Sequence, residues 1–260
     1  RKIPGHPSKL RVFRALARIL SPGGLALRDE YGVRLLVDPF DYIGHAMCFS
    51  GSFEPLSVKL ARQLMTGGGT FLDVGSNIGL FTCSVASVPG VRCLAVEAAA
   101  AAFAKLQVNL LRNPGKLVSA VNAALAAQRS LVRLDKPREG NLGATRVSAD
   151  LSGFEIEGHI VAAIPLDELL IAAKVESIRV MKIDVEGFEP EVFQGMDFTA
   201  GYRPENIIME WVPDSRLSRD NLAFCFELLS RNGYEPLSVT GSQFADAQLL
   251  PEENVWWRRC

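Results

Sequence analysis

From residue 70 onwards, short apolar runs alternate with amphipathic helical patterns, and this alternation is typical of a parallel α/β sheet. The predicted strands are Thr70–Val74, Arg92–Glu97, Leu117–Val121, Ile178–Ile183 and Asn206–Trp211. The predicted helices are Leu80–Val88, Ala99–Leu111, Glu189–Gly195 and Asn221–Asn232, and Ile164–Lys174 is predicted to carry a short helix after Pro165. A terminal hairpin is expected from Tyr234–Val239 and Val255–Arg259. The pattern predicts an α/β sheet with helices on both faces.

The pattern is different before residue 51, where we expect a separate extension. A basic amphipathic helix is predicted over Lys9–Leu20, after a possible cap at Ser8. A hairpin is predicted from Leu25–Arg28 and Val33–Val37, whereas Asp41–Gly51 is predicted to be irregular. We therefore divide the chain into residues 1–50, the extension, and 51–260, the domain that carries the sheet.

The segment Ala123–Val161 also interrupts the alternation. It is predicted to be a looser insert that contains one strand-like stretch, Leu131–Leu134, and the glycine-bearing Gly140–Gly143.

The stretch Thr70–Cys83, TFLDVGSNIGLFTC, predicts a strand, a glycine-spaced turn and a helix. In doubly wound sheets such a unit binds nucleotide-like ligands. Its spacing is G-x-x-x-G after Asp73, which differs from the G-x-G-x-x-G that receives a pyrophosphate. A carboxylate beside the turn would repel a phosphate and would suit a cation. S-adenosylmethionine (SAM) carries an ammonium and a sulfonium and no phosphate, so the motif favours SAM over NAD.

Polar residues stand at or near the ends of all five predicted parallel strands, and such ends meet at one edge of a sheet. They are Asp73, Glu97, Asn122, Asp184 and Glu210. Glu97 lies 22 positions after Gly75, close to the spacing of about 20 at which an acidic residue meets ribose hydroxyls in this topology. Asn122 and Ala123 are expected at an adenine edge.

The stretch VMKIDVEGFEPEVFQGM, Val180–Met196, places Asp184 and Glu186 directly after a buried strand. Two such carboxylates are costly to bury unless they are paired, hydrated or used, and Lys182 is close enough in sequence to offset one of them. The plain alternative is a solvated loop.

Composition narrows the classes of partner. Residues 1–28 hold seven basic and no acidic residues, which leaves 21 basic against 29 acidic residues in the remainder. This acidic body makes a large nucleic-acid interface improbable, while the basic segment, residues 8–20, suits either packing on the domain or peripheral contact with an anionic membrane. No apolar run approaches the roughly 18 to 20 residues of a membrane span, and none is typical of a signal peptide. Five cysteines without a C-x-x-C pattern favour reduced thiols and a cytoplasmic protein.

Several of these motifs together resemble the FkbM family of class I SAM-dependent methyltransferases. The matching segments are GSFEP (Gly51–Pro55), FLDVGSNIGLFT, LAVEA, IPLDELL, VMKIDVEGFEPEVFQGM and IIMEW. The resemblance implies a Rossmann-like sheet of seven strands whose last strand is antiparallel. It also implies SAM contacts from Asp73, Gly75, Asn77, Gly79 and Glu97, and a methyl-transfer centre at Asp184 and Glu186. The chain departs from the family at Ala98, where proline usually follows the acidic residue.

Glu54 of GSFEP and Ser76 of the turn are further candidates for the cofactor site. For methyl transfer to an alcohol, a base is useful because a neutral hydroxyl is a weak nucleophile. Asp184 is the first candidate, with Glu186 or Glu210 orienting the acceptor, and His45 is a second candidate base. The acidic cluster leaves open a divalent ion, although no ligand spacing identifies one.

We therefore expect an O-methyltransferase that acts on a sugar, a glycan or another hydroxylated small molecule. Three alternatives stay open. They are a methyltransferase for a nitrogen or carboxylate of a larger partner, a SAM- or nucleotide-binding module without catalysis, and an NAD-linked oxidoreductase.

Overall fold

The computed structural model describes residues 25–29, 31–135, 147–148, 158–211, 219–244 and 253–260. The predicted basic helix over Lys9–Leu20 and the Gly140–Gly143 stretch lie outside these residues.

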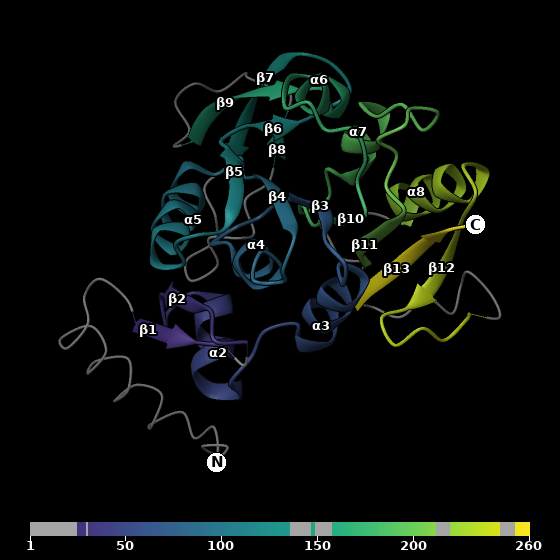
Figure 1. Cartoon of the computed structure of the whole chain (residues 1–260). Helices are drawn as coiled ribbons and strands as arrows, with labels where there is room; N and C mark the ends of the chain where they lie inside the picture. The colour runs from purple at the N-terminus through teal and green to yellow at the C-terminus, as the bar shows by residue number, and fades with distance from the viewer. Residues whose placement is uncertain (1–24, 30, 136–146, 149–157, 212–218, 245–252) are drawn as a thin grey trace.

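A sheet of seven strands forms the centre of the described chain (Figure 1). In spatial order its strands are β12 (Tyr234–Ser238), β13 (Glu253–Arg259), β11 (Asn206–Trp211), β10 (Val180–Ile183), β3 (Gly69–Val74), β4 (Val91–Val96) and β5 (Leu117–Val121). The five strands from β11 to β5 are parallel, and β13 is antiparallel to both of its neighbours. The predicted sheet and its terminal hairpin are therefore confirmed.

Helices cover both faces of this sheet. On one face, α3 (Pro55–Leu64) and α4 (Leu80–Val85) share a hydrophobic cluster with Phe71 of β3 and Ile208 of β11. On the other face, three helices share a larger hydrophobic cluster that includes Trp257 of β13. These helices are α6 (Leu166–Ala172), α7 (Glu189–Gln194) and α8 (Arg219–Arg231). The central strands β3, β4, β10 and β11 are mostly buried, which explains their continuous apolar runs in the sequence.

The described part of the extension, from residue 25 onwards, packs directly on the sheet domain. The hairpin β1 (Leu25–Arg28) and β2 (Arg34–Val37) lies beside α5 (Ala100–Arg112). Asn109 of α5 is fully buried, and its side chain accepts from the N–H of Leu36 at 2.6 Å and donates to the carbonyl of Ile78 at 2.8 Å. One amide therefore joins the hairpin to the loop after β3.

The prediction that Asp41–Gly51 is irregular is wrong, because Tyr42–Ser50 forms helix α2. Asp41 caps the helix through its carboxylate, which accepts from the N–H of Tyr42 at 2.9 Å. Gly44 has a packing role in this helix. A Cβ there would lie 1.9 Å from the carbonyl oxygen of Asp38, so only glycine allows the helix to approach so closely.

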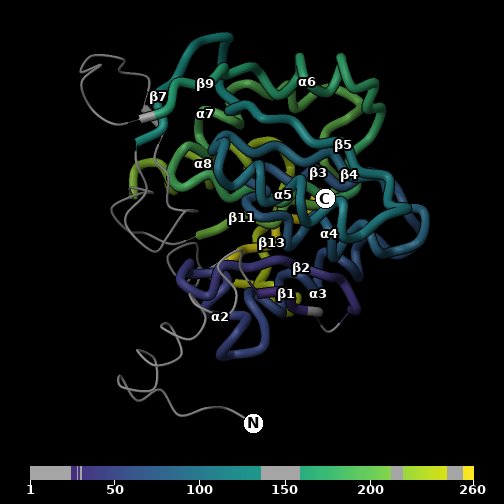
Figure 2. Tube along the Cα trace, turned by 90° about the vertical axis from the view of Figure 1, so that its left-hand side faces the viewer, coloured from purple at the N-terminus to yellow at the C-terminus, as the bar shows by residue number. Residues whose placement is uncertain are grey.

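The insert after β5 is more regular than predicted. It forms a second, four-stranded sheet of β6 (Ala124–Leu125), β9 (Gly158–Ile164), β7 (Ser130–Asp135) and β8 (Val147–Ser148). The predicted strand Leu131–Leu134 is part of β7. Figures 1 and 2 both place this sheet at one end of the molecule and α2 with the β1–β2 hairpin at the other.

Candidate functional site

The glycine-spaced turn after β3 is held against the ends of both neighbouring strands. The N–H groups of Gly75 and Ser76 donate to the carbonyl of Val96 at 2.9 and 3.0 Å. Gly75 has a φ of +81°, and a Cβ on it would lie 1.8 Å from the carbonyl oxygen of Asp184. Gly79 has a φ of +87°, and a Cβ there would lie 2.5 Å from a methyl carbon of Leu106. The backbone contact leaves no room for a Cβ at Gly75, and the left-handed conformation of Gly79 favours glycine there.

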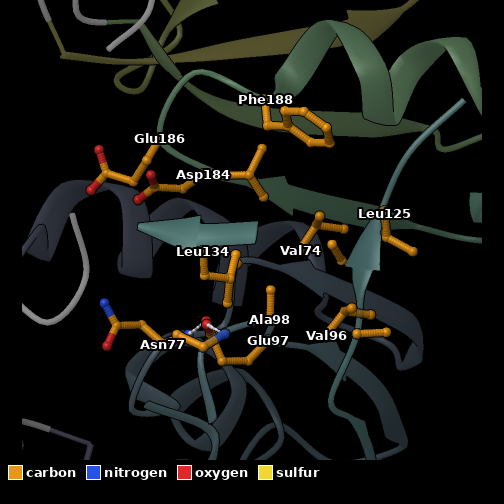
Figure 3. A pocket seen from close by; sticks show the side chains of 15 residues that line it. Val74, Asn77, Val96, Glu97, Ala98, Leu125, Leu134, Asp184, Glu186 and Phe188 are labelled. Carbon is orange, nitrogen blue, oxygen red and sulfur yellow. Dashed lines mark hydrogen bonds between the residues drawn. The ribbon is translucent and has the colours of Figure 1, made fainter. Parts of the chain in front are cut away.

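A pocket opens at the carboxyl ends of β3, β4 and β10, where the strand ends predicted it. It encloses about 620 Å³, including its open mouth. Polar or charged lining comes from Asn77, Glu97, Asp184 and Glu186. The apolar lining consists of Val74, Val96, Ala98, Ala99, Ala123, Ala124, Leu125, Leu134, Val185 and Phe188. Figure 3 shows Glu97 and Asn77 on one wall, and Asp184 and Glu186 on the wall across from them.

Glu97 is nearly buried and is fixed by backbone donors. Its two carboxylate oxygens accept from the N–H of Ala99 at 2.7 Å and from the N–H of Asn77 at 2.8 Å (Figure 3). Burial raises the pKa of Glu97 to about 7, although these two hydrogen bonds oppose the rise. Each carboxylate oxygen keeps a further lone pair, so Glu97 can still accept from hydroxyls in the pocket.

Asp73 lies deeper than the pocket. It is 1% exposed, and its carboxylate accepts hydrogen bonds from the hydroxyl and the backbone N–H of Thr82. Burial raises the pKa of Asp73 to about 6, against these hydrogen bonds and the charge of Lys182. Asp73 is not among the residues that line the pocket within the described chain. The structure thus gives it a role in holding α4 on β3.

The acidic end of the pocket is built around Lys182. The ammonium of Lys182 lies 3.4 Å from a carboxylate oxygen of Asp184, whose side chain is 27% exposed. Glu54, at the start of α3, accepts a hydrogen bond from the side-chain amide of Asn254 at 2.7 Å. Burial raises the pKa of Glu54, and the charge of Lys182 opposes this rise. Burial lowers the pKa of Lys182, but the nearby carboxylates outweigh it and hold the pKa above its ordinary value.

The loop that presents Asp184 and Glu186 has a strained backbone and is held in place by buried Glu189. Glu186 has a φ of +57° and Gly187 a φ of +101°. Glu189 is fully buried, and its carboxylate accepts from the N–H of Val185 at 3.0 Å. Burial raises the pKa of Glu189 to about 7. The second carboxylate oxygen of Glu189 is buried without a hydrogen-bond partner in the described structure.

This buried carboxyl predicts a pH-dependent stability. The pKa of Glu189 is raised from 4.5 to about 7, so the folded state favours the neutral carboxyl. The contribution of Glu189 to the free energy of unfolding is therefore fully present below about pH 4.5 and is lost as the pH rises through about 7. We therefore expect the stability of Glu189→Gln relative to the native chain to increase by an amount on the order of 1–3 kcal/mol when the pH is raised from 5 to 8. Urea unfolding at the two pH values measures this gap. The exposed control Glu176→Gln should show no such change, and a Glu189→Gln gap that is equal at both pH values would contradict the prediction.

The other predicted residues are spread more widely. Ala123 lines the pocket, whereas the side chain of Asn122 donates to the carbonyls of Glu97 and Ala98 at 2.7 and 3.0 Å. The buried hydroxyl of Ser76 donates to the Val96 carbonyl at 3.2 Å. Asn122 and Ser76 therefore hold the end of β4 from two sides.

His45 lies in α2 with its ring 4.4 Å from that of Phe49, and it is not among the residues that line the pocket. Glu210 lies in β11 opposite Asn254 of β13, on the Lys182 side of the site.

In the part of the chain that the structure describes, no group of three or more His, Cys, Asp or Glu residues is placed to hold a metal ion. No helix among the described residues is long and apolar enough to cross a membrane.

Sequence reasoning missed most of the apolar pocket wall. Leu134 comes from β7 of the insert, and no local signal places it near residue 97. Leu125 and Phe188 follow strand ends that were already candidates, so their position next to those ends could have indicated them. All five cysteines are unpaired, in agreement with the predicted reduced thiols, and Cys83, Cys93 and Cys225 are buried.

Comparison with known proteins agrees with this architecture. The methyltransferase FkbM domain matches residues 73–236. The hexuronic acid methyltransferase AglP of Haloferax volcanii is 32% identical over 191 residues, which cover 73% of this chain and 75% of AglP.

Partial similarity to solved structures was also found. An O-methyltransferase from Bacillus cereus in complex with SAH has a TM-score of 0.46 at 14% identity, with 95% of this chain and 96% of that chain covered. A TehB-like SAM-dependent methyltransferase from Corynebacterium glutamicum has a TM-score of 0.47 at 12% identity, with 84% and 94% covered. The matched domain and the curated relative, together with the sheet order, show that this chain is a SAM-dependent methyltransferase that belongs to the FkbM family.

Proposed function

We propose that the enzyme transfers the methyl group to a hydroxyl of a sugar or another hydroxylated small molecule, with Asp184 as the base. The observation that carries this proposal is the position of Asp184. Its carboxylate lines the pocket at the end of β10, remains partly exposed and is paired on its inner side with buried Lys182. A base in this place can accept a proton from a bound hydroxyl without losing its fixed orientation.

The pocket residues fit SAM. Glu97 offers acceptor positions for the two ribose hydroxyls, and Ala123, Leu125 and Phe188 offer an apolar surface for the adenine. The side-chain oxygen of Asn77 is buried beside this pocket without a partner in the described structure, so it can accept from a donor of the cofactor. When bound, SAM supplies a methyl group that its sulfonium already activates.

The remaining work of this site is alignment and proton removal. In-line transfer needs the acceptor oxygen to be held close to the methyl carbon and opposite the sulfur. Glu186 lies beside Asp184 on the pocket wall, and we assign it to orienting the acceptor through a hydroxyl (Figure 3). Glu210 is a second candidate for orientation, and His45 remains the alternative base from the extension.

The acceptor class draws support from the name of the relative AglP, a hexuronic acid methyltransferase. A carbohydrate acceptor suits a site with several carboxylates, because sugar hydroxyls donate hydrogen bonds to carboxylate oxygens. A hexuronic acid offers both hydroxyls and a carboxylate as methyl acceptors. The carboxylates of Asp184 and Glu186 would repel the carboxylate of a hexuronic acid, which favours a hydroxyl of the acceptor at the reaction centre.

The test is incubation of the enzyme with labelled SAM and matched acceptors. The panel pairs each neutral glycoside with the corresponding hexuronic acid and its preformed methyl ester, and adds a phenol and an amine. Mass spectrometry with fragmentation then locates the methyl group. We expect an ether-linked methyl on a sugar hydroxyl. Exclusive ester formation or N-methylation would overturn the proposed acceptor, and calorimetric binding of NAD without binding of SAM would overturn the cofactor assignment.

A further inference from the structure

Lys182 is a buried charge at the centre of the acidic end of the site. Its residue exposure is 2%, although it stands in a strand of otherwise apolar residues, VMKI. Its ammonium also lies over the ring of Phe81 at 5.3 Å from the ring centre. A buried ammonium is costly unless it is paired, so a lysine at this position needs a partner or a function.

Carboxylates from four elements surround this ammonium. Within the parallel sheet, Lys182 stands directly beside Asp73 of β3, and Asp184 follows two residues later on the same face. Glu210 of β11 and Glu54 at the start of α3 also act on its charge. The lysine therefore connects the sheet to the GSFEP segment that leads into the domain.

The carboxylates of this group have different interaction partners. Asp73 is bound by Thr82, and Glu54 is bound by Asn254. The contact between Lys182 and Asp184 is a direct ion pair at 3.4 Å, and Asp184 is the member of this group that lines the pocket. Lys182 is thus the buried side of a pair whose outer side faces the reaction centre.

We propose that Lys182 is a positioning residue for methyl transfer, which fixes the Asp184 carboxylate in its place at the pocket. This inference rests on the proposed function, because it assigns to Lys182 an action through Asp184. Lys182 itself is not among the residues that line the pocket in the described structure, so we assign it an action through Asp184 and no direct contact with the substrate. It acts by charge and by orientation: an ammonium at fixed position holds the carboxylate with one oxygen inward and the other available to the acceptor.

A kinetic double-mutant cycle tests this action. Lys182→Met removes the charge with little change of side-chain length, and we expect kcat to fall about 10- to 100-fold while the Kd of SAM changes less than about threefold. In an Asp184→Asn background, the same substitution should lower kcat further by less than about threefold. Equal losses in both backgrounds, or an unchanged kcat in Lys182→Met, would overturn the proposal.

Lys105→Met is the matched control. Lys105 of α5 pairs with Asp38 at 4.0 Å and belongs neither to the pocket wall nor to the Lys182 group. Its replacement should leave kcat unchanged, and calorimetric SAM binding verifies that each variant is folded. If Lys182→Met does not fold, the cycle uses Lys182→Arg, whose longer side chain moves the charge away from its place beside Asp184. Additive losses would again overturn the proposal.

A second readout does not depend on turnover. Thermal melting of the same four proteins should show a smaller effect of Lys182→Met in the Asp184→Asn background than in the native one. Equal shifts in both backgrounds would overturn the pairing of Lys182 with Asp184. If the native enzyme methylates no acceptor in the panel, the proposed function fails, and the melting cycle still decides whether this pair exists.

Discussion

Replacing Asp184 by asparagine is expected to lower kcat by about 10²- to 10⁴-fold, the range typical of a lost general base. Asparagine keeps the shape of the side chain and an acceptor oxygen, but it cannot take the proton of a hydroxyl acceptor. The Kd of SAM should change by less than about threefold, because Glu97, the proposed partner of the ribose, lies across the pocket from Asp184 (Figure 3). Steady-state kinetics with the identified acceptor, together with calorimetric titration of SAM, measures both quantities.

Asp167→Asn is a suitable control for this experiment. Both carboxylate oxygens of Asp167, in the first turn of α6, accept from the N–H of Asp197, and asparagine retains one of these acceptors. Its kcat should equal that of the native enzyme. An Asp184→Asn enzyme with full turnover would remove Asp184 from the role of base and would direct the search to His45. A combined loss of turnover and SAM affinity would instead indicate that Asp184 binds the cofactor.

Replacing Glu97 by alanine is expected to weaken SAM binding about 10- to 100-fold. The expected loss corresponds to about 1.4–2.8 kcal/mol, which is close to the net contribution of about 1.5–3 kcal/mol from one hydrogen bond between a ribose hydroxyl and a charged carboxylate. The substitution also frees the N–H groups of Asn77 and Ala99 that Glu97 now accepts from, so part of the loss could come from the loop. Calorimetry with a SAM analogue that lacks both ribose hydroxyls separates the two effects, since it should bind both proteins with nearly equal affinity.

The pH dependence of the same measurement is a further check on Glu97. Burial raises its pKa to about 7, so the carboxylate that accepts from hydroxyls forms as the pH rises from about 6 to 8. SAM binding to the native enzyme should therefore strengthen over this range relative to binding to Glu97→Ala. A constant ratio of the two Kd values from pH 6 to pH 8, or equal losses for SAM and for the analogue, would contradict the ribose assignment.

The sequence alone determined the features that depend on neighbouring residues. Continuous apolar runs defined the strands because both faces of a parallel sheet are buried. The strand ends then predicted that Glu97 and Asp184 would share one edge, since parallel strands end on the same side. The glycine turn was placed correctly as well, although the close approaches of Gly75 to Asp184 and of Gly79 to Leu106 required the structure.

Only the tertiary structure decided the contacts between segments far apart in the chain. It turned Asp73 towards Thr82, made Tyr42–Ser50 a helix against Asp38, and brought Leu134 of the insert to the pocket. It also gathered four carboxylates around Lys182 from separate elements. The physical reason is that strand pattern and turn chemistry act locally, whereas burial and charge pairing depend on which distant side chains the packed fold brings together.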